Sequence, residues 1–365
     1  MVERLISSLA ACRPAGRALD AAIVALRRGE AVLFSGREET VLALAAEFVD
    51  DGNLQRLRQV SARQLHLVLT RRRAVALGLA LHDALSGAVS ITLTPELPAA
   101  VIRNLADPAG SLGVEPPLGL EPAVAEGGEL AAVALAKLAA LLPAALVLPL
   151  APAEAALARR HTDFAVVDIT EVLTRRAATA GLTRVAEARV PLADAEDARL
   201  IAFRPGDGGS EHLAILIGTP DPGAPVLVRL HSECLTGDLL ASLRCDCGNQ
   251  LRGAIAAIAR AGGGVLLYLV NKLRTYQLQD ASFDTVDANE QLGFDADERV
   301  YLPAAEMLRQ LGFTAVRLLT NDPDKIAALE SYGIRIVERV PHVFLANGQN
   351  ERFLRTKATR SGHLL

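Results

Sequence analysis

The chain has 365 residues, a length that favours two domains, since single domains usually run to about 100–200 residues. Hydrophobic residues make up 51% of it, enough for two buried cores. The net charge of −4 and the aromatic content of 4% argue against a nucleic-acid-binding protein, because they indicate neither a basic surface nor a stacking platform.

No segment has the pattern of a signal peptide or a membrane span. Residues 1–16 contain arginines and lack a continuous apolar core followed by a cleavage site. Residues 130–150 form the most apolar run, but Lys137, Pro143 and Pro149 interrupt it. This pattern predicts a helix followed by a buried strand. We therefore expect a soluble, cytoplasmic protein without membrane partners.

Helical and extended patterns alternate between residues 18 and 176, which is typical of an α/β or α+β domain. Helices are expected at 18–26, 41–48 and 131–142, and strands at 31–34, 65–70, 89–94, 144–148 and 164–169. Further along, strands are expected at 226–230, 265–269 and 315–319, and a helix at 251–261. The fold class predicted for the chain is thus α/β, with α+β mixed sheets.

Three of the four cysteines, Cys234, Cys245 and Cys247, lie within residues 228–250. A chain without secretory features that concentrates its thiols in this way usually holds a metal. Three thiolates without an obvious fourth partner favour Zn²⁺ with one open position, because structural zinc sites are normally closed by four protein ligands. The fourth cysteine, Cys12, is expected to be a small core residue.

Two other interpretations of this segment stay open. His231 or Asp246 would close the site as a fourth ligand, or the thiols are merely buried and reduced. In an open site, three thiolates leave the zinc with a formal charge of about −1, so a bound water needs cationic or hydrogen-bonding help. Arg229 and Arg244 are candidates for that help.

The motif R-L-H-S-E-C-L-T-G-D at residues 229–238 is followed by L-R-C-D-C-G at residues 243–248. Together they closely resemble the zinc motif of GTP cyclohydrolase II, the first enzyme of riboflavin biosynthesis. The resemblance continues in the right order through residues 270–280, 284–289, 292–294, 297–299 and 317–321. It covers roughly the second half of the chain and is highly specific.

The resemblance implies a hydrolase that opens the imidazole ring of GTP and releases formate and pyrophosphate, leaving a diaminopyrimidine ribosyl phosphate. It also implies Zn²⁺ on Cys234, Cys245 and Cys247, Mg²⁺ carried with the triphosphate, and a homodimer. The residues that match substrate-binding positions are Arg229, Leu230, His231, Ser232, Glu233, Gln250, Thr285, Thr320 and Lys325.

Three further residues match catalytic positions of the family. Tyr276 would lie near the base, where its ring can stack on guanine; without the resemblance it would be a half-buried helix tyrosine. Asp297 would be the proton acceptor, and Arg299 is the residue named as nucleophile on the α-phosphate. Because a guanidinium stays protonated at neutral pH, clamping the phosphoryl oxygens is an easier role for Arg299 to justify.

Residues 320–325, T-N-D-P-D-K, connect an expected strand to an expected helix. A hydroxyl and a lysine at such a turn suit an anion near the helix start. Asp322 and Asp324 stand where many family members have neutral or basic residues. We expect them to weaken the phosphate field.

The expected strand at 265–269 runs directly into residues 270–274, which are expected to be helical. Such a connection usually needs residues with turn chemistry. Family members carry here a nucleotide-contacting loop of the type R-Q-E-G-R-G-I-G-L. Either the loop is deleted, which removes phosphate and ring contacts, or it exists in the protein outside the printed residues. The clean junction favours the second explanation.

The first half distantly resembles 3,4-dihydroxy-2-butanone-4-phosphate synthase, a usual fusion partner of the cyclohydrolase, in residues 42–47 and 131–144. The chemistry of that family is missing. Only residues 37–39, R-E-E, remain of an acidic cluster, Gly128 replaces a histidine, and Pro149 replaces a glutamate. Because a magnesium-dependent sugar-phosphate enzyme needs oxygen ligands and a proton shuttle, we expect a non-catalytic domain that serves packing, dimerisation or regulation.

Residues 181–191 resemble the start of a free-standing cyclohydrolase, so we expect domains at 1–181 and 182–365. In the first domain, His66, His82 and His161 are expected to be ordinary polar or capping residues. Two other functions stay open: a nucleotide-binding or regulatory homologue that has lost turnover with the loop, and a paralogue that acts on another purine.

Overall fold

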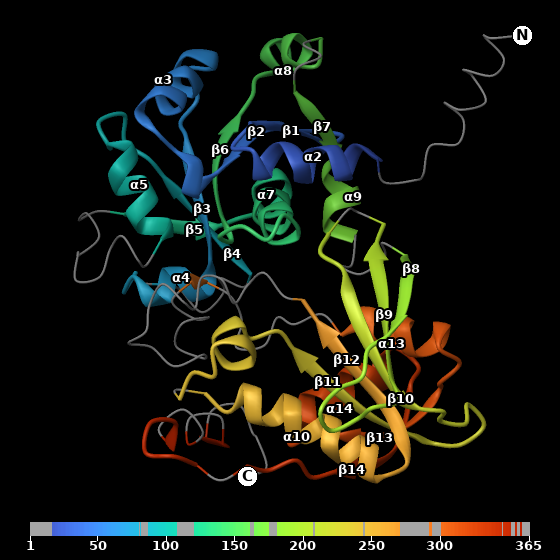
Figure 1. The fold of residues 1–365 in the computed structure, drawn as a ribbon. Coiled ribbons are helices and arrows are strands. Elements are labelled where there is room, and N and C mark those ends of the chain that lie inside the picture. The colour runs from blue at the N-terminus through green and yellow to red at the C-terminus, as the bar shows by residue number, and fades with distance from the viewer. Residues whose placement is uncertain are drawn as a thin grey trace, which may run out of the picture. The chain divides into compact units, whose positions relative to one another are not determined.

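The structure is a computed structural model of the chain, drawn as a ribbon in Figure 1. It describes residues 17–79, 81, 87–107, 120–160, 164–174, 181–206, 209–243, 245–270, 292–293, 301–344, 346–351, 355 and 358–359. The chain forms two compact units, Met1–Arg176 with Asn289–Asp295, and Ala177–Ala288 with Ala296–Leu365.

The described residues of the first unit form a sheet with the strand order β5-β4-β3-β6-β2-β1-β7. Its strands are β1 (Val32–Ser35), β2 (Thr40–Ala45), β3 (His66–Thr70), β4 (Ala88–Thr92), β5 (Pro122–Val124), β6 (Ala144–Pro149) and β7 (Ala165–Asp168). Its helices are α2 (Arg17–Arg27), α3 (Asp51–Val60), α4 (Arg71–Ala76), α5 (Ala99–Ala106), α7 (Gly127–Leu138), α8 (Pro152–Ala158) and α9 (Ile169–Thr174), with the 3-10 turn η1 (Ala46–Phe48).

Helices cover both faces of this sheet (Figure 1). On one face α2, α7 and α9 pack against strand side chains such as Phe34. On the other face α3, α5 and α8 pack against side chains such as Leu67. Because both faces are buried, the central strands are apolar throughout and do not alternate with polar residues.

The helix expected at residues 41–48 is wrong. These residues form most of β2, followed by η1, and every residue of β2 is buried. β2 lies between β1 and β6 in a sheet covered by helices on both faces, so its side chains meet packed atoms whichever face they point to. A short run of valine, leucine and alanine fits a helix and a buried strand equally well, and burial in the sheet decides between them.

The second unit is built on a sheet with the order β14-β13-β11-β12-β10-β9-β8. The strands are β8 (Leu182–Arg189), β9 (Ala198–Pro205), β10 (His212–Gly218), β11 (Val226–Ser232), β12 (Gly263–Leu269), β13 (Ala315–Leu319) and β14 (Arg335–Val340). The described helices are the π-helical turn η2 (Leu235–Leu239), α10 (Cys247–Arg260), α13 (Leu302–Gln310) and α14 (Pro323–Ser331).

The strands β14, β13, β11 and β12 are parallel, whereas β12, β10, β9 and β8 pair antiparallel in turn. The carboxyl ends of β11, β12 and β13 therefore lie at one edge of the sheet. In open sheets of this kind, ligands bind outside the carboxyl ends of the strands.

The chain continues from β12 without an insertion. No residue separates Leu269 from Val270 in the full sequence, and the backbone N–H of Val270 donates to His212 Nδ1 at 3.2 Å. The 365-residue sequence thus lacks the loop, and the choice between the two explanations stays a prediction. Val270 is not helical, and the rest of the helix expected at 270–274 lies outside the described residues.

The expected fold class is confirmed: the chain is mixed α/β with two sheets in two domains. The boundary at Leu182 stays a prediction. Cys12, His82 and His161 lie outside the described residues, whereas His66 Nδ1 lies 2.5 Å from the Glu129 carboxylate. No described helix combines the length and the apolar character that crossing a membrane requires.

Gly264 on β12 tests how tightly this sheet packs. A Cβ at this position would lie 2.3 Å from Leu227 O and 2.9 Å from Cγ2 of Ile258. Since overpacking a core typically costs about 1–3 kcal/mol, Gly264→Ala should lower the free energy of unfolding by about that amount, measured by urea denaturation. Gly348→Ala is the matched control, because no atom lies within 4 Å of its Cβ position. Equal losses in the two variants would contradict the packing argument.

Candidate metal centre

β11 carries the centre and lies in the middle of the parallel part of the sheet. All its residues, V-L-V-R-L-H-S, are buried, and it pairs with β12 on one side and β13 on the other. One residue beyond the strand, the N–H of Glu233 donates to Leu269 O at 2.9 Å and prolongs the pairing with β12. Cys234 therefore leaves the sheet from a fixed place at the carboxyl edge.

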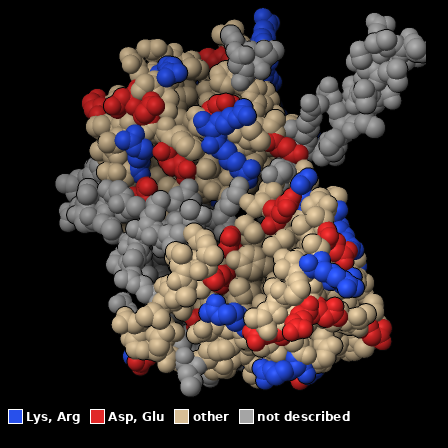
Figure 2. All heavy atoms as spheres, viewed as in Figure 1, with Lys and Arg blue, Asp and Glu red and all other residues tan. Residues whose placement is uncertain are grey.

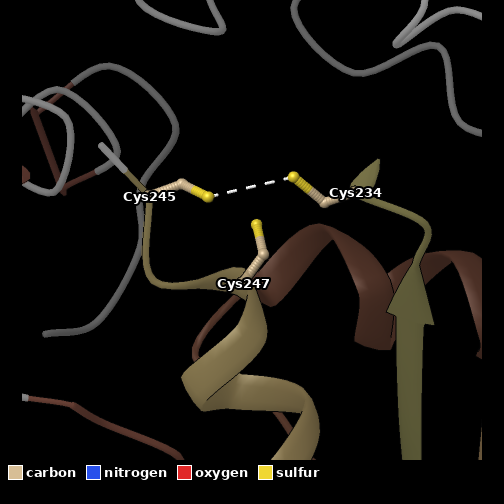
Figure 3. Close-up of side chains that lie close together, drawn as sticks. All are labelled: Cys234, Cys245 and Cys247. Atoms are coloured by element: carbon tan, nitrogen blue, oxygen red, sulfur yellow. Dashed lines mark hydrogen bonds between the residues drawn. The ribbon is translucent and has the colours of Figure 1, made fainter. Parts of the chain in front are cut away.

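Three thiols converge beyond this strand end (Figure 3). The Sγ atoms of Cys234, Cys245 and Cys247 all lie within 4.8 Å of one another, and those of Cys234 and Cys245 are 3.8 Å apart. Two thiolates about 2.3 Å from one tetrahedral Zn²⁺ are themselves about 3.8 Å apart. The cluster fits three ligands of a single ion, and no fourth His, Cys, Asp or Glu joins it within the described part of the chain.

Two glycines allow the segments that carry these thiols to approach closely. A Cβ on Gly237, in η2, would lie 2.7 Å from Cys245 Sγ and 2.9 Å from Cys247 Cβ. A Cβ on Gly248, in α10, would lie 2.2 Å from Gly237 O. Backbone therefore packs against backbone here, and only glycine leaves room for the sulfur atoms.

The thiol of Cys245 keeps its proton unless a bound cation displaces it. Hydrogen bonds with Cys234 and then Cys247, followed by burial, raise the pKa of Cys245 well above its ordinary value. Cys247 is the first residue of α10. Thiols that ionise when a metal binds and displaces their protons are the donor set of such a site.

His231, one of the two residues considered as a fourth ligand, is bonded elsewhere. Its Nε2 lies 3.0 Å from each carboxylate oxygen of Asp238, and its ring stacks on Tyr268 with centroids 5.5 Å apart. Burial lowers the pKa of His231, so the imidazole is neutral at pH 7. His231 is therefore not part of the three-cysteine cluster.

Asp246, the other candidate, is buried and belongs to a series of hydrogen bonds that lie partly in the interior. Its carboxylate accepts from Nε2 of Gln250, and Oε1 of Gln250 accepts from Nη2 of Arg229. Nη1 of Arg229 donates to Leu319 O at 2.9 Å. These hydrogen bonds link the segment that carries Cys245 and Cys247, through α10 and β11, to the end of β13.

The turn after β13 is stabilised by its own side chains. Thr320 Oγ1 accepts the N–H of Asp322 at 3.0 Å, and Asp322 Oδ1 accepts the N–H of Asp324 at 3.1 Å as the N-cap of α14. Thr320 and Lys325 are both buried. Asp322 thus has a local role in starting the helix.

The family model of GTP cyclohydrolase II matches residues 183–341, which include all three thiols. Over nearly its whole length the chain is similar to a GTP cyclohydrolase-2 of Azospirillum brasilense, with 54% identity over 364 residues, 95% of this chain and 94% of the relative. The chain belongs to the GTP cyclohydrolase II family.

Other relatives of this family match shorter stretches. A GTP cyclohydrolase-2 of Azotobacter vinelandii is 57% identical over 166 residues, 43% of this chain and 80% of the relative. The riboflavin biosynthesis protein RibBA of Bacillus cereus is 42% identical over 295 residues, 73% of this chain and 74% of the relative. Among solved structures, RibBX, a two-domain 3,4-dihydroxy-2-butanone 4-phosphate synthase from A. baumannii, has 17% identity and a TM-score of 0.34, covering 83% of this chain and 93% of its own.

The residues expected to bind substrate do not share one kind of environment. Leu230 points into the hydrophobic core, and Arg229, His231 and Gln250 are bonded to protein groups. Ser232, Thr320 and Lys325 are buried, and Glu233 is half-buried. The remaining expected residues, Tyr276, Thr285, Asp297, Arg299 and Arg244, lie outside the described residues.

Four residues of the centre did not emerge from the sequence. Asp238 and Tyr268 surround His231, and Asn321 exchanges two hydrogen bonds with the backbone of His342, at 2.7 and 2.9 Å. Asp238 and Asn321 do lie in the sequence motifs at 229–238 and 320–325, but the contacts of all four residues form only through the fold.

His342 gives a test of the packing on α10. Burial, with the nearby charge of Arg229, lowers its pKa to about 4 from the ordinary 6.5. An unfolded chain takes up this proton near pH 6.5, whereas the folded chain resists until about pH 4. His342 therefore makes its full contribution to the free energy of unfolding above pH 6.5. This contribution falls by up to about 3 kcal/mol as the pH falls towards 4. In metal-free protein, His342→Gln should flatten this decline in thermal unfolding, and an unchanged slope would contradict it.

Proposed function

We propose that this chain hydrolyses GTP as a GTP cyclohydrolase II, in the first step of riboflavin biosynthesis. The reaction opens the imidazole ring, releases formate and pyrophosphate, and leaves a diaminopyrimidine ribosyl phosphate. The observation that carries the proposal is the cluster of Cys234, Cys245 and Cys247 at the carboxyl end of β11, inside the region that matches the family.

We propose Zn²⁺ as the metal of this cluster. Thiolates are soft ligands that suit zinc, and the separation of 3.8 Å between two of the sulfur atoms fits tetrahedral coordination. The two residues that would close the site, His231 and Asp246, are engaged with Asp238 and Gln250. When bound, the ion supplies the Lewis-acid activation of water that ring opening requires.

We propose that Arg229 acts indirectly to offset the negative charge of a site with three thiolates. Its guanidinium is buried and bonded to Gln250, which is bonded to Asp246 between two of the cysteines. A charge-assisted chain of this kind orients the ligand segment and offsets part of its negative charge. Arg229 therefore acts through its neighbours, and Arg244 remains the candidate for a direct role.

The nucleotide is proposed to lie along the same sheet edge, with its phosphates near the turn after β13. Thr320 and Lys325 flank the start of α14, where the helix N-terminus favours an anion. Mg²⁺ is proposed to arrive with the triphosphate. Tyr276 would stack on the base, Asp297 would accept a proton, and Arg299 would clamp the phosphoryl oxygens.

The wider setting is also a proposal: a cytoplasmic homodimer that has GTP as its partner and binds neither nucleic acid nor membrane. On the faces drawn in Figure 2, basic and acidic side chains are interleaved in each unit and do not gather into one basic patch. Interleaved charge gives little attraction for a phosphate backbone.

The first domain is proposed to be non-catalytic. A Cβ on Gly128, which replaces the histidine of the synthase family, would lie 2.8 Å from Val41, and Val41 is the register partner of Pro149, which replaces the glutamate. The two lost positions thus meet around one apolar side chain. Glu39, which remains of the acidic cluster, accepts the N–H of Gly128 at 2.9 Å and so serves the start of α7.

A second candidate function is a nucleotide-binding homologue that keeps zinc without turnover. The direct connection of Leu269 to Val270 favours it, because the resemblance places nucleotide contacts in the loop that this chain lacks. A paralogue acting on another purine is the third. Formate release from GTP, compared with other purine nucleotides, separates the three.

The first test joins zinc content to turnover. Zinc-loaded, full-length protein should release formate from GTP, and Cys245→Ser should lose zinc and at least about 100-fold of that activity together, since one ligand of three is removed. Cys12→Ser is the matched control, because it changes the one cysteine outside the segment. Turnover that persisted in Cys245→Ser without zinc would refute the metal mechanism, and a zinc-loaded parent that released no formate would favour the second candidate.

The second test concerns Arg299. If its guanidinium clamps the phosphoryl oxygens, Arg299→Ala should leave the zinc content unchanged and slow pyrophosphate release by about 100-fold or more. Arg309→Ala is the control, because Arg309 is a solvent-exposed partner of Glu306 on α13. Parent-like kinetics in Arg299→Ala would remove this residue from the site.

A further inference from the structure

Asp238 is the hub of the hydrogen bonds around the first thiol. Its side chain is only 6% exposed and belongs to η2, the turn that follows Cys234. Oδ2 accepts the backbone N–H of Cys234 at 2.9 Å and the hydroxyl of Tyr268 at 3.0 Å. Both carboxylate oxygens also lie 3.0 Å from Nε2 of His231.

Two hydrogen bonds with Asp238 close a ring around Cys234. The N–H of Cys234 donates to the carboxylate, and the N–H of Asp238 donates to Cys234 O at 2.7 Å. The N–H and the C=O of the cysteine are thus tied to one residue. This arrangement restrains the backbone torsions of Cys234 and hence the direction of its Cα–Cβ bond, from which Sγ extends.

The remaining hydrogen bonds join this ring to the sheet. His231 on β11 and Tyr268 on β12 are register partners, and their rings stack at an interplanar angle of 20°. Burial, together with the Asp238 carboxylate, raises the pKa of Tyr268, so its phenol keeps its proton and donates. The neutral imidazole of His231 donates through Nε2–H. Two neighbouring strands therefore hold the same carboxylate.

We infer that Asp238 is a positioning residue for the metal, which turns Cys234 Sγ towards the other two thiols and anchors it to β11 and β12. Asp238 is not itself a ligand, because the ligand group consists of the three cysteines. Outer partners of this kind typically change metal affinity by about 10–100-fold when they are replaced. The inference rests on the metal site proposed above.

Asp238→Asn keeps the shape of the side chain but exchanges one acceptor oxygen for a donor. Full-length protein is titrated with Co²⁺, and with Zn²⁺ against a chromophoric chelator. We expect Kd to rise by about tenfold or more. At saturation, the ligand-field and thiolate-to-cobalt bands should also change, because Cys234 Sγ is no longer held in place. A general loss of stability would weaken binding without changing the spectrum of bound cobalt.

Asp221→Asn is the matched control for this variant. Its carboxylate also accepts a backbone N–H, that of Gly223 at 2.9 Å, but in an exposed turn away from the thiols. Its metal affinity and cobalt spectrum should equal those of the parent.

Tyr268→Phe gives a second measurement, because it removes one donor and keeps the stacked ring. It should raise Kd less than Asp238→Asn does, and the double variant should bind no more weakly than Asp238→Asn alone, since both changes act through one contact. Parent-like affinity in either single variant, an unchanged cobalt spectrum in Asp238→Asn, or additive effects would overturn the role of Asp238. A parent that bound no Co²⁺ would instead remove the metal site and the function proposed for it.

Discussion

The backbone contact between Gly237 and Gly248 is the constraint on which the metal centre depends. The carbonyl group of Gly237 occupies the space that a side chain on Gly248 would need. Because of this contact, η2, which follows Cys234, lies against the first turn of α10, which begins with Cys247, and the three thiols come within reach of one ion. Neither side of the contact could form the site alone, since Cys234 comes before η2 whereas Cys245 and Cys247 lie at the start of α10.

The sheet fixes the position of this contact. β11 is buried on both faces and held between two parallel neighbours, so the point at which Cys234 leaves it is set by hydrogen bonds in the sheet and not by the loop. The chain of Arg229, Gln250 and Asp246 then ties the cysteine segment to the end of β13. The groups proposed for metal binding and for phosphate recognition therefore lie at one edge of the sheet, and elements of a sheet position side chains more precisely than loops do.

The sequence predicted those parts of the centre that depend on local spacing. Cys245 and Cys247 are separated by one residue and Cys234 is close along the chain, so a shared ion follows from the pattern, and the structure brings the three sulfur atoms together. The contacts of His231 could not be predicted, because Tyr268 comes from another strand and reaches it only through the register of β11 and β12. The helix expected at 41–48 failed for a related reason, since burial between two strands is a property of the sheet.

The absence of the loop from this sequence separates metal binding from nucleotide binding. The thiol cluster is built from β11, η2 and α10, all of which precede the junction of Leu269 and Val270, and the pairing of Glu233 with Leu269 is intact. The proposed metal site therefore does not include the missing residues. The contacts proposed for Tyr276, Asp297, Arg299, Thr320 and Lys325 with a nucleotide come from segments beyond β12. It follows that a zinc-loaded chain is expected whether or not it turns over GTP, so zinc content alone cannot distinguish an enzyme from a binding homologue, and only the release of formate can.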